Sequence, residues 1–513
     1  MIEMLLPCIN KQYEIKGLPP VKFDYTAFAP VGHNFEPLLQ EKNRELPGLN
    51  LPPNYMSIDL YGEGIPGVLY SDGTTTLYWE PEGNGNGTTG EVKYAPPKQL
   101  LNFPIERHLQ DADRMLTDLA GDGRMALVVS TSGASGYYQY DPDHDIWQNF
   151  QPFAGFPTDF HNPDNQMVDV TGDGLMDILL VEPDRLRIYP NQGEKGYGTP
   201  LIHNQENDVP TLKQGAVEES LHFADIFGTG KQHLFRITNG SVECWPNLGY
   251  GRFGKKIQLA NAPRFDERMD ASRLFLVDID GSGTADIAYV SSDRIQIWFN
   301  QSGNSFSEPR SIGLPSKWDN LNQINFADIL GNGTTCLVFS ENHPQPRHWC
   351  YDFCAKQKPY LLNQVDNNLG AISKITYASS TKFYLQDKHN RRHWVTKLPF
   401  PVHVVEKVES IDKISNTRLV SSYTYHHGYY DRIEREFRGF GRVERQDAEI
   451  LNANALSSDV PPVLTKTWYH VGAWEQEGLL SRQYEKEYFQ GDKDAYLLPD
   501  SVFDYTDYQG KLI

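Results

Sequence analysis

The sequence predicts an all-β protein, in which a six-bladed β-propeller over residues 20–355 is followed by a strand-rich segment over residues 356–513. Three observations support this prediction. One aspartate–glycine motif recurs six times at a nearly constant spacing, and the residues between its copies alternate as short strands do. The recurrence stops near residue 356, whereas the strand-like alternation continues. Residues 1–19 precede the first strand-like run and are interpreted as an N-terminal extension.

The composition is that of a large folded protein. Its 513 residues include 47 Lys and Arg against 67 Asp and Glu, a formal net charge of −20 at pH 7. Such a charge repels nucleic acids and anionic lipids, so neither is expected as a partner. No apolar stretch approaches the ~18 residues that a transmembrane helix needs, and the first residues lack the basic start and long apolar run of a signal peptide.

The repeated motif reads apolar–Asp–apolar–x–Gly–x–Gly and is followed by an apolar run. Its copies are about 54 residues apart and begin at Asp59, Asp118, Asp169, Asp225, Asp278 and Asp328. The two glycines reach positive φ at little cost, and the aspartate can accept hydrogen bonds from the amides of its own turn. Each copy is therefore interpreted as a tight corner between two strands.

A second mark recurs inside the units, because Asn191, Asn247 and Asn300 each follow their aspartate after 22 residues. Runs such as RLRIY, SVECW and RIQIW are rich in branched and aromatic residues, which is typical of strands. A unit of about four short strands cannot bury its own apolar faces, so six units are expected to pack around one axis. The segment LPPVKFDYTAFAP at residues 18–30 is expected to close the last blade.

Two copies of the motif carry oxygen-bearing side chains at alternating positions, as a calcium loop does. The third copy offers Asp169, Thr171, Asp173 and Asp177, and the fifth offers Asp278, Asp280, Ser282 and Asp286. The other copies lose this pattern, for example through Ala126 or His233. Calcium in the third or fifth blade is the one cofactor that the sequence suggests, whereas a hydrogen-bonded turn without metal is the favoured interpretation.

Other groupings of reactive side chains are interpreted as structural. His343, His348, Cys350 and Cys354 lack the second pair of ligands of a zinc knuckle. The basic run around Lys388 and Arg391 to His393 is interpreted as a solvated loop, and His426 and His427 as structural histidines rather than a pH sensor.

The triplet from Ser130 to Ser132 and the pair Glu434 and Glu436 echo an ADP-ribosyltransferase, but they stand about 300 residues apart. No nucleophile with its base and no phosphate-binding loop emerges from the sequence. The protein is therefore predicted not to be an enzyme.

Beyond residue 356, long alternating runs such as ISKITYASSTKFYL and RLVSSYTYHHGYYDRIEREF indicate a wide sheet with one solvated face. The chain is expected to be a fragment of a longer protein, or part of a shell that another chain continues.

The residues that identify a family are DLYGEGIPGVLY from Asp59, CWPNLGYGRFG from Cys244, DIDGSGTADIAYV from Asp278, KPYLLNQVDNNLG from Lys358 and EREFRGFG from Glu434. With these motifs the chain resembles, over nearly its entire length, the B component of insecticidal ABC toxin complexes, which is related to plasmid virulence toxins. The resemblance implies an FG-GAP-like propeller and the start of a shell of Rhs and YD repeats.

The same resemblance implies a secreted, non-catalytic subunit that docks onto the channel of an A component and gates the passage of an effector. Its second partner would be a C-terminal Rhs and effector chain. The chain departs from the family in lacking the large N-terminal domain, most of the shell, the self-cleaving region and an effector. The alternative left open is an extracellular, calcium-dependent propeller of the integrin type that recognises a protein or a glycan.

Overall fold

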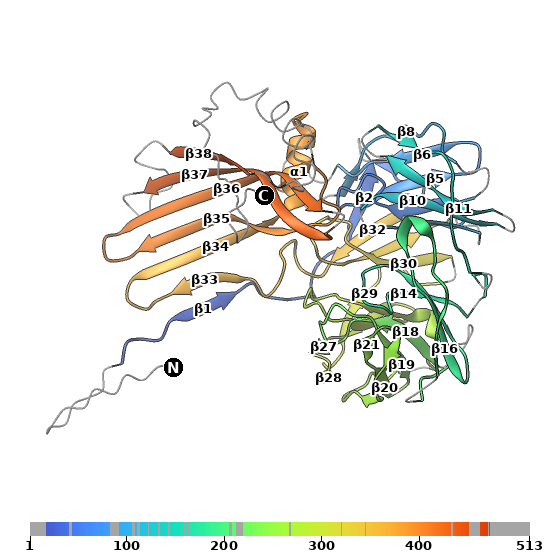
Figure 1. Cartoon of the computed structure of the whole chain (residues 1–513). Helices are drawn as coiled ribbons and strands as arrows, with labels where there is room; N and C mark the ends of the chain where they lie inside the picture. Colours follow the sequence, from blue (N-terminus) through green and yellow to red (C-terminus); the bar gives the residue numbers. More distant parts are fainter. Residues whose placement is uncertain are drawn as a thin grey trace, which may run out of the picture.

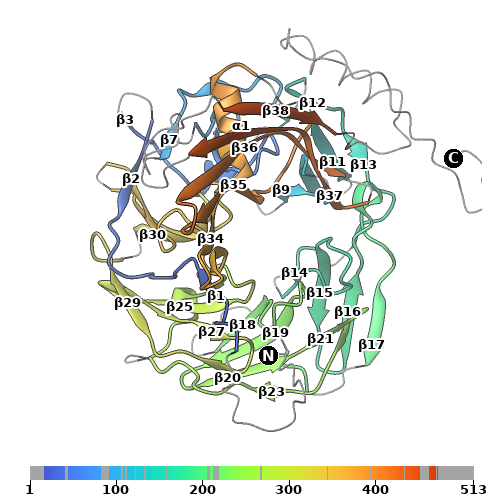
Figure 2. The ribbon, with the colours of Figure 1, turned by 90° about the vertical axis from the view of Figure 1, so that its left-hand side faces the viewer.

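The fold consists of a ring of six small sheets beside one large sheet (Figure 1, Figure 2). The structure is a computed structural model, which describes residues 17–40, 44–82, 92–104, 108–109, 113–121, 123–131, 134–141, 144–157, 160–162, 164–204, 208–211, 219–265, 268–319, 321–343, 345–392, 394, 396–431, 434–450, 462–469 and 471. The predicted all-β fold with a six-bladed propeller is confirmed.

Each blade is an antiparallel sheet whose first strand lies nearest the axis. Blade 1 holds β4 (Tyr55–Ile58), β5 (Gly67–Ser71), β6 (Thr76–Trp79) and β8 (Lys98–Gln99). Blade 2 holds β9 (Arg114–Asp118), β10 (Met125–Thr131), β11 (Ala134–Asp141), β12 (Ile146–Trp147) and β13 (Gln151–Pro152). Blade 3 holds β14 (Gln166–Val168), β15 (Asp177–Val181), β16 (Arg185–Tyr189) and β17 (Leu201–Asn204).

Blades 4 to 6 repeat this order. Blade 4 holds β18 (Ser220–Ala224), β19 (His233–Thr238), β20 (Ser241–Trp245) and β23 (Ile257–Gln258), and blade 5 holds β24 (Leu274–Val277), β25 (Asp286–Val290), β26 (Arg294–Trp298) and β29 (Arg310–Gly313). Blade 6 holds β30 (Asn322–Ala327), β31 (Cys336–Glu341), β32 (Arg347–Asp352) and β2 (Glu36–Gln40). The minor strands are β3 (Arg44–Glu45), β7 (Val92–Tyr94), β21 (Asn247–Gly249), β22 (Arg252–Phe253), β27 (Asn300–Gln301) and β28 (Ser305–Phe306).

The larger buried clusters of the ring lie between neighbouring blades, whereas two small ones lie within blades 2 and 3. One buried cluster joins Phe235 and Val242 of blade 4 to Ile287 and Trp298 of blade 5. Because each blade shields the apolar face of the next, the ring supplies the burial that a single unit lacks. The short strands of one unit can therefore be stable only in the company of the others.

The ring is closed by β2, which pairs with β32 through Glu36 opposite Cys350 and Pro37 opposite Trp349. The expectation that residues 18–30 close the last blade is wrong. Residues 22–25 of that segment form β1 (Lys22–Tyr25), which pairs with β33 (Leu362–Asp366) in the large sheet. All four side chains of β1 are exposed, whereas β2 places Leu38 fully inside the core, which is what a closing strand requires.

The large sheet has the order β1, β33, β34 (Ala371–Ser379), β35 (His403–Asp412), β36 (Thr417–Asp431), β37 (Glu436–Ile450) and β38 (Val463–Trp468). The predicted wide sheet is thus present, but its first long run is broken by helix α1 (Ser380–His389). Ser379 caps this helix by accepting a hydrogen bond from the amide of Thr381. A small core of Phe383, Trp394, Leu398, Val404 and Phe440 fixes α1 on the sheet.

Two short 3-10 turns, Gly193–Lys195 and Ala271–Arg273, complete the elements. Among the described residues, no helix has the length and apolar character that a membrane span requires. The domain limits expected from the sequence, 20–355 for the propeller and 356–513 for the strand-rich segment, stay a prediction. One strand crosses them, because β1 lies within the first range but pairs in the large sheet.

Candidate docking faces of the propeller

The six aspartate–glycine motifs are hydrogen-bonded corners, as expected. In each copy the second glycine donates its amide to the carboxylate of the aspartate, with N···O distances of 2.5 to 3.0 Å. Both glycines have positive φ, for example +67° at Gly62 and +77° at Gly64. A side chain at either position would strain the backbone, so the two glycines are required by the turn itself.

The residue eight positions after the aspartate connects the corner to the recurring asparagine. Asp177 Oδ1 accepts the amide of Asn191 at 2.9 Å, and Asp286 Oδ1 accepts the amide of Asn300 at 2.8 Å. In blade 4 the same task falls to His233, whose Nδ1 accepts the amide of Asn247 at 2.9 Å. Since a histidine can replace the aspartate here, acceptance of a hydrogen bond is the common requirement at this position.

The calcium candidates differ between the two blades. In blade 5, Asp278, Asp280 and Asp286 offer ligand atoms within 4.8 Å of one another. Among the described residues, these three carboxylates form the one cluster of three or more His, Cys, Asp or Glu side chains close enough to hold a metal ion. Burial raises the pKa of Asp286 well above its ordinary value, and the charge of Asp280 adds to this shift. Three clustered carboxylates suit a hard cation, although all three already accept hydrogen bonds.

In blade 3, the carboxylates of Asp169, Asp173 and Asp177 all accept backbone amides, and Asp177 also accepts the hydroxyl of Thr171. In blade 5, the hydroxyl of Ser282 lies 2.9 Å from that of Thr284. Calcium therefore stays a prediction, and blade 5 is the better candidate.

Chelation of calcium is expected to change the melting temperature of the chain by less than about one degree, because protein donors already satisfy these carboxylates. Differential scanning fluorimetry with millimolar calcium and with EDTA measures this. A rise of several degrees in calcium that disappears in Asp280→Asn would instead establish a calcium site and favour the calcium-dependent binding propeller.

Five of the six corners contact the segment that follows the propeller. At blade 5, Lys358 Nζ donates to the carbonyl of Gly281 at 2.7 Å, and the hydroxyl of Tyr360 donates to Asp280 at 3.0 Å. At blade 6, Ser379 Oγ donates to the carbonyl of Gly331 at 2.8 Å. The sequence motif does not reveal these contacts, because their partners lie far away in the chain.

The corners of blades 1 to 3 meet the same segment. Lys388 and Tyr384 of α1 bind the carboxylate of Glu63, and the guanidinium of Arg435 donates to the carbonyl of Asp173. At blade 2, a side chain on Gly123 would lie 2.6 Å from Pro399. We call this side of the ring, defined by the six corners, the corner face.

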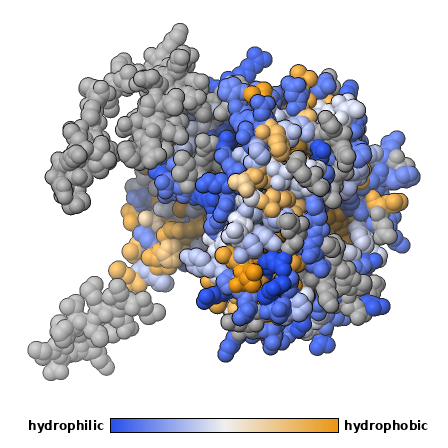
Figure 3. All heavy atoms as spheres, turned by 45° about the vertical axis from the view of Figure 1, so that its right-hand side comes forward, coloured by the Kyte–Doolittle hydropathy of each residue, from blue (hydrophilic) through white to orange (hydrophobic). Residues whose placement is uncertain are grey.

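Among the residues that the structure describes, the large sheet lies on the corner side of the ring, and the opposite side faces away from it (Figure 1). Because the strands of a blade are antiparallel, the turns that follow each second and fourth strand lie at the other end from the corners. We call this side the open face and define it by the turns 72–75, 182–184, 239–240 and 291–293 together with Leu101 and Leu321. Leu101 and Leu321 are 70% and 62% exposed. Figure 3, which brings this side forward, shows a mostly polar surface with scattered apolar groups.

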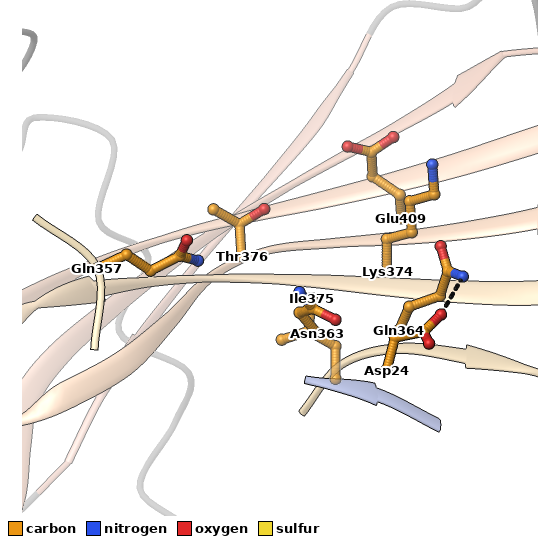
Figure 4. A pocket seen from close by; sticks show the side chains of 8 residues that line it. All are labelled: Asp24, Gln357, Asn363, Gln364, Lys374, Ile375, Thr376 and Glu409. Carbon is orange, nitrogen blue, oxygen red and sulfur yellow. Dashed lines mark hydrogen bonds between the residues drawn. The ribbon is translucent and has the colours of Figure 1, made fainter. Parts of the chain in front are cut away.

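A groove of about 420 Å³ lies on the large sheet (Figure 4). Neighbouring strands contribute Asp24, Gln364, Lys374 and Glu409 to one row across the sheet. Gln364 donates to Asp24 at 2.9 Å, and Glu409 also pairs with Lys407 at 2.6 Å. Because acidic, basic and amide side chains share this row, the groove is a polar sheet surface.

The remaining sequence candidates lie in structural roles. His348 is buried and its Nδ1 lies 2.8 Å from Ser340 Oγ, and His426 Nδ1 lies 2.5 Å from Asp387. Burial first, and then the neighbouring charge of His426, lowers the pKa of His427 to about 3. Lys388 is not in a solvated loop, which corrects that prediction, because it lies in the last turn of α1 against two carboxylates.

Ser130 lies in buried strand β10, Glu436 begins β37, and Ser132 is outside the described residues. His393 is also outside the described residues. The zinc candidates His348, Cys350 and Cys354 do not form a metal-binding group among the described residues.

Comparison with known proteins connects this architecture to a family. Residues 300–472 match the family model described as the insecticide toxin TcdB middle/N-terminal region. A search of curated proteins finds no match. The chain is similar to one in a Photorhabdus luminescens Tc holotoxin pore, with 33% identity, a TM-score of 0.82 and 91% of this chain covered.

It is also similar to a chain in a crystal structure of TcdB2-TccC3, with 31% identity, a TM-score of 0.66 and the same coverage of 91%. The chain spans 21% and 22% of the length of these two relatives. The chain thus holds a B-component-like propeller of the insecticidal toxin complex type.

Proposed function

We propose that this chain is a non-catalytic part of a secreted toxin complex, whose propeller docks onto the channel of an A component and gates the passage of an effector. The large sheet begins the shell, which a C-terminal Rhs and effector chain completes. The similar structures, described as a holotoxin pore and as TcdB2-TccC3, support this proposal.

The observation that carries the proposal is that, in the described part of the chain, its own large sheet covers the corner face of the ring but not the open face (Figure 1). Five corners already contact the chain's own segment from Lys358 to Arg435. A second protein therefore has the open face as its accessible docking surface. Exposed leucines within a polar surface are suited to such a contact, because their burial on binding is favourable.

The test replaces exposed apolar side chains of the open face by charged ones. The double variant Leu101→Arg and Leu321→Arg is expected to bind a purified A component at least tenfold more weakly in biolayer interferometry. Its melting temperature should stay unchanged, because both side chains are exposed.

The matched control lies at the rim of the corner face, where Leu248 and Tyr250 are 61% and 81% exposed. The double variant Leu248→Arg and Tyr250→Arg is expected to bind as the native chain does. Native affinity of the first variant would refute docking through the open face. The absence of any complex between the native chain and an A component would refute the proposed function as a whole.

A further inference from the structure

The propeller and the large sheet are connected by two chain segments that run side by side. Residues 26–35 lead from β1 to blade 6, and residues 353–361 lead from blade 6 to β33. The amide of Thr26 donates to the carbonyl of Leu361 at 2.8 Å, and the amide of Tyr360 donates to the carbonyl of Thr26 at 3.0 Å. Among the described residues, side-chain contacts at the corner side of the ring add to this connection.

Helix α1 makes the most highly charged of these contacts. Tyr384 and Lys388 lie one turn apart and therefore point to the same side, toward blade 1. Lys388 Nζ lies 3.0 Å from both carboxylate oxygens of Glu63 and 3.1 Å from Glu80 Oε2. The side chain of Glu63 is only 5% exposed, so this ion pair is largely shielded from water.

Negative groups outnumber the positive charge at this contact. The titratable groups at the corner of blade 1 are the carboxyls of Asp59, Glu63 and Glu80, the hydroxyls of Tyr61, Tyr78 and Tyr384 and the ammonium of Lys388, with Lys98 and Asp145 beyond Tyr61. Burial raises the pKa of Asp59 to about 7, and the charge of Glu63 adds to this shift. Burial alone would lower the pKa of Lys388, but Glu63 and Glu80 outweigh it and raise this pKa. Removal of Lys388 would leave buried carboxylates without a counter-charge.

We propose that α1 is a releasable latch, which holds blade 1 against the large sheet through Lys388 and loosens as salt or pH rises. The latch goes beyond the proposed function, because it is a property of the chain without any partner. Salt weakens it by screening the exposed part of the ion cluster.

The direction of the pH effect follows from the proton on Asp59. Opening of the latch admits water to the corner, so the pKa of Asp59 returns toward its ordinary value of 3.8. Opening then releases a proton, and the closed form is favoured at acid pH. This stabilisation is fully present below about pH 4 and is lost as the pH rises through about 7.

Hydrogen exchange of the whole chain tests the latch at two amides. The amides of Glu63 and Gly64 donate to Asp59 at 3.0 and 2.7 Å, so their protection reports on the corner of blade 1. Lys388→Met is expected to lower this protection at least tenfold. The matched control is Lys382→Met on the same helix, because Lys382 pairs at 2.6 Å with Glu406 of the large sheet. The control should leave the two amides as protected as in the native chain.

The pH dependence is measured on the same amides after division by their intrinsic exchange rates. Between pH 5 and 8, the protection in the native chain is expected to fall by about a hundredfold, as a pKa of about 7 in the closed form and 3.8 in the open form requires. Asp59→Asn should abolish this dependence, and if that variant does not fold, Glu63→Gln should reduce it. Native protection in Lys388→Met, or protection independent of pH in the native chain, would overturn the proposal.

Discussion

Asp286→Ala is expected to lower the free energy of unfolding by about 2–5 kcal/mol, because it deletes two buried hydrogen bonds at once. Asp286 is fully buried, and its two oxygens accept the amides of Ile279 at 3.0 Å and Asn300 at 2.8 Å. Without the carboxylate, both amides stay inside the protein without an acceptor. Urea unfolding followed by fluorescence measures the loss.

Two replacements at the same position separate a hydrogen-bonding role from a metal-binding role. Asp286→His copies the arrangement of His233 in blade 4, so it is expected to cost less than half as much as the alanine variant. Asp286→Asn keeps one acceptor oxygen and should also cost less. A loss that appears only when calcium is present would contradict the structural role and identify Asp286 as a ligand.

Leu38→Ala is expected to lower the free energy of unfolding by about 2–5 kcal/mol, since it opens a cavity where the ring closes. Leu38 belongs to a cluster that contains Leu46, Val68, Trp79 and Val338, so it connects blade 6 to blade 1. Loss of its packing weakens the closing strand and with it the neighbouring blades. Thermal and urea unfolding of the purified variant provide the measurement.

The matched control for Leu38 is Leu18→Ala, because Leu18 is 84% exposed. This substitution should change the stability by no more than about 0.5 kcal/mol. Equal losses of unfolding free energy in Leu38→Ala and Leu18→Ala would contradict the role of β2 as the closing strand. They would favour closure by residues 18–30 instead.

The local parts of the fold could be predicted from the sequence because their chemistry is local. A corner needs an aspartate and two glycines within seven residues, so each of the six copies is visible in the sequence, from Asp59 to Asp328. The regular spacing of these copies then determines the number of blades. The recurring asparagine was also visible, although its role in binding the corner of its own blade was not.

Contacts between distant residues could not be predicted in this way. The pairing of Glu36 with Cys350 leaves no period in the sequence, and residues 22–25 alternate polar with aromatic side chains whereas residues 36–40 do not alternate. Helix α1 was missed because its ten residues have little amphipathic pattern and follow a strand directly. The ion cluster of Glu63 and Lys388 joins residues that no motif connects.

The amino-acid sequence alone thus determined the corners, the strands between them and the six-fold count, because turn chemistry and alternation act over a few residues. Only the tertiary structure decided which strand closes the ring, which face the chain covers itself and where charge is buried. These features depend on groups that are distant in the chain, by 48 residues for Ser379 and Gly331 and by 325 for Glu63 and Lys388, and that meet only as a consequence of folding.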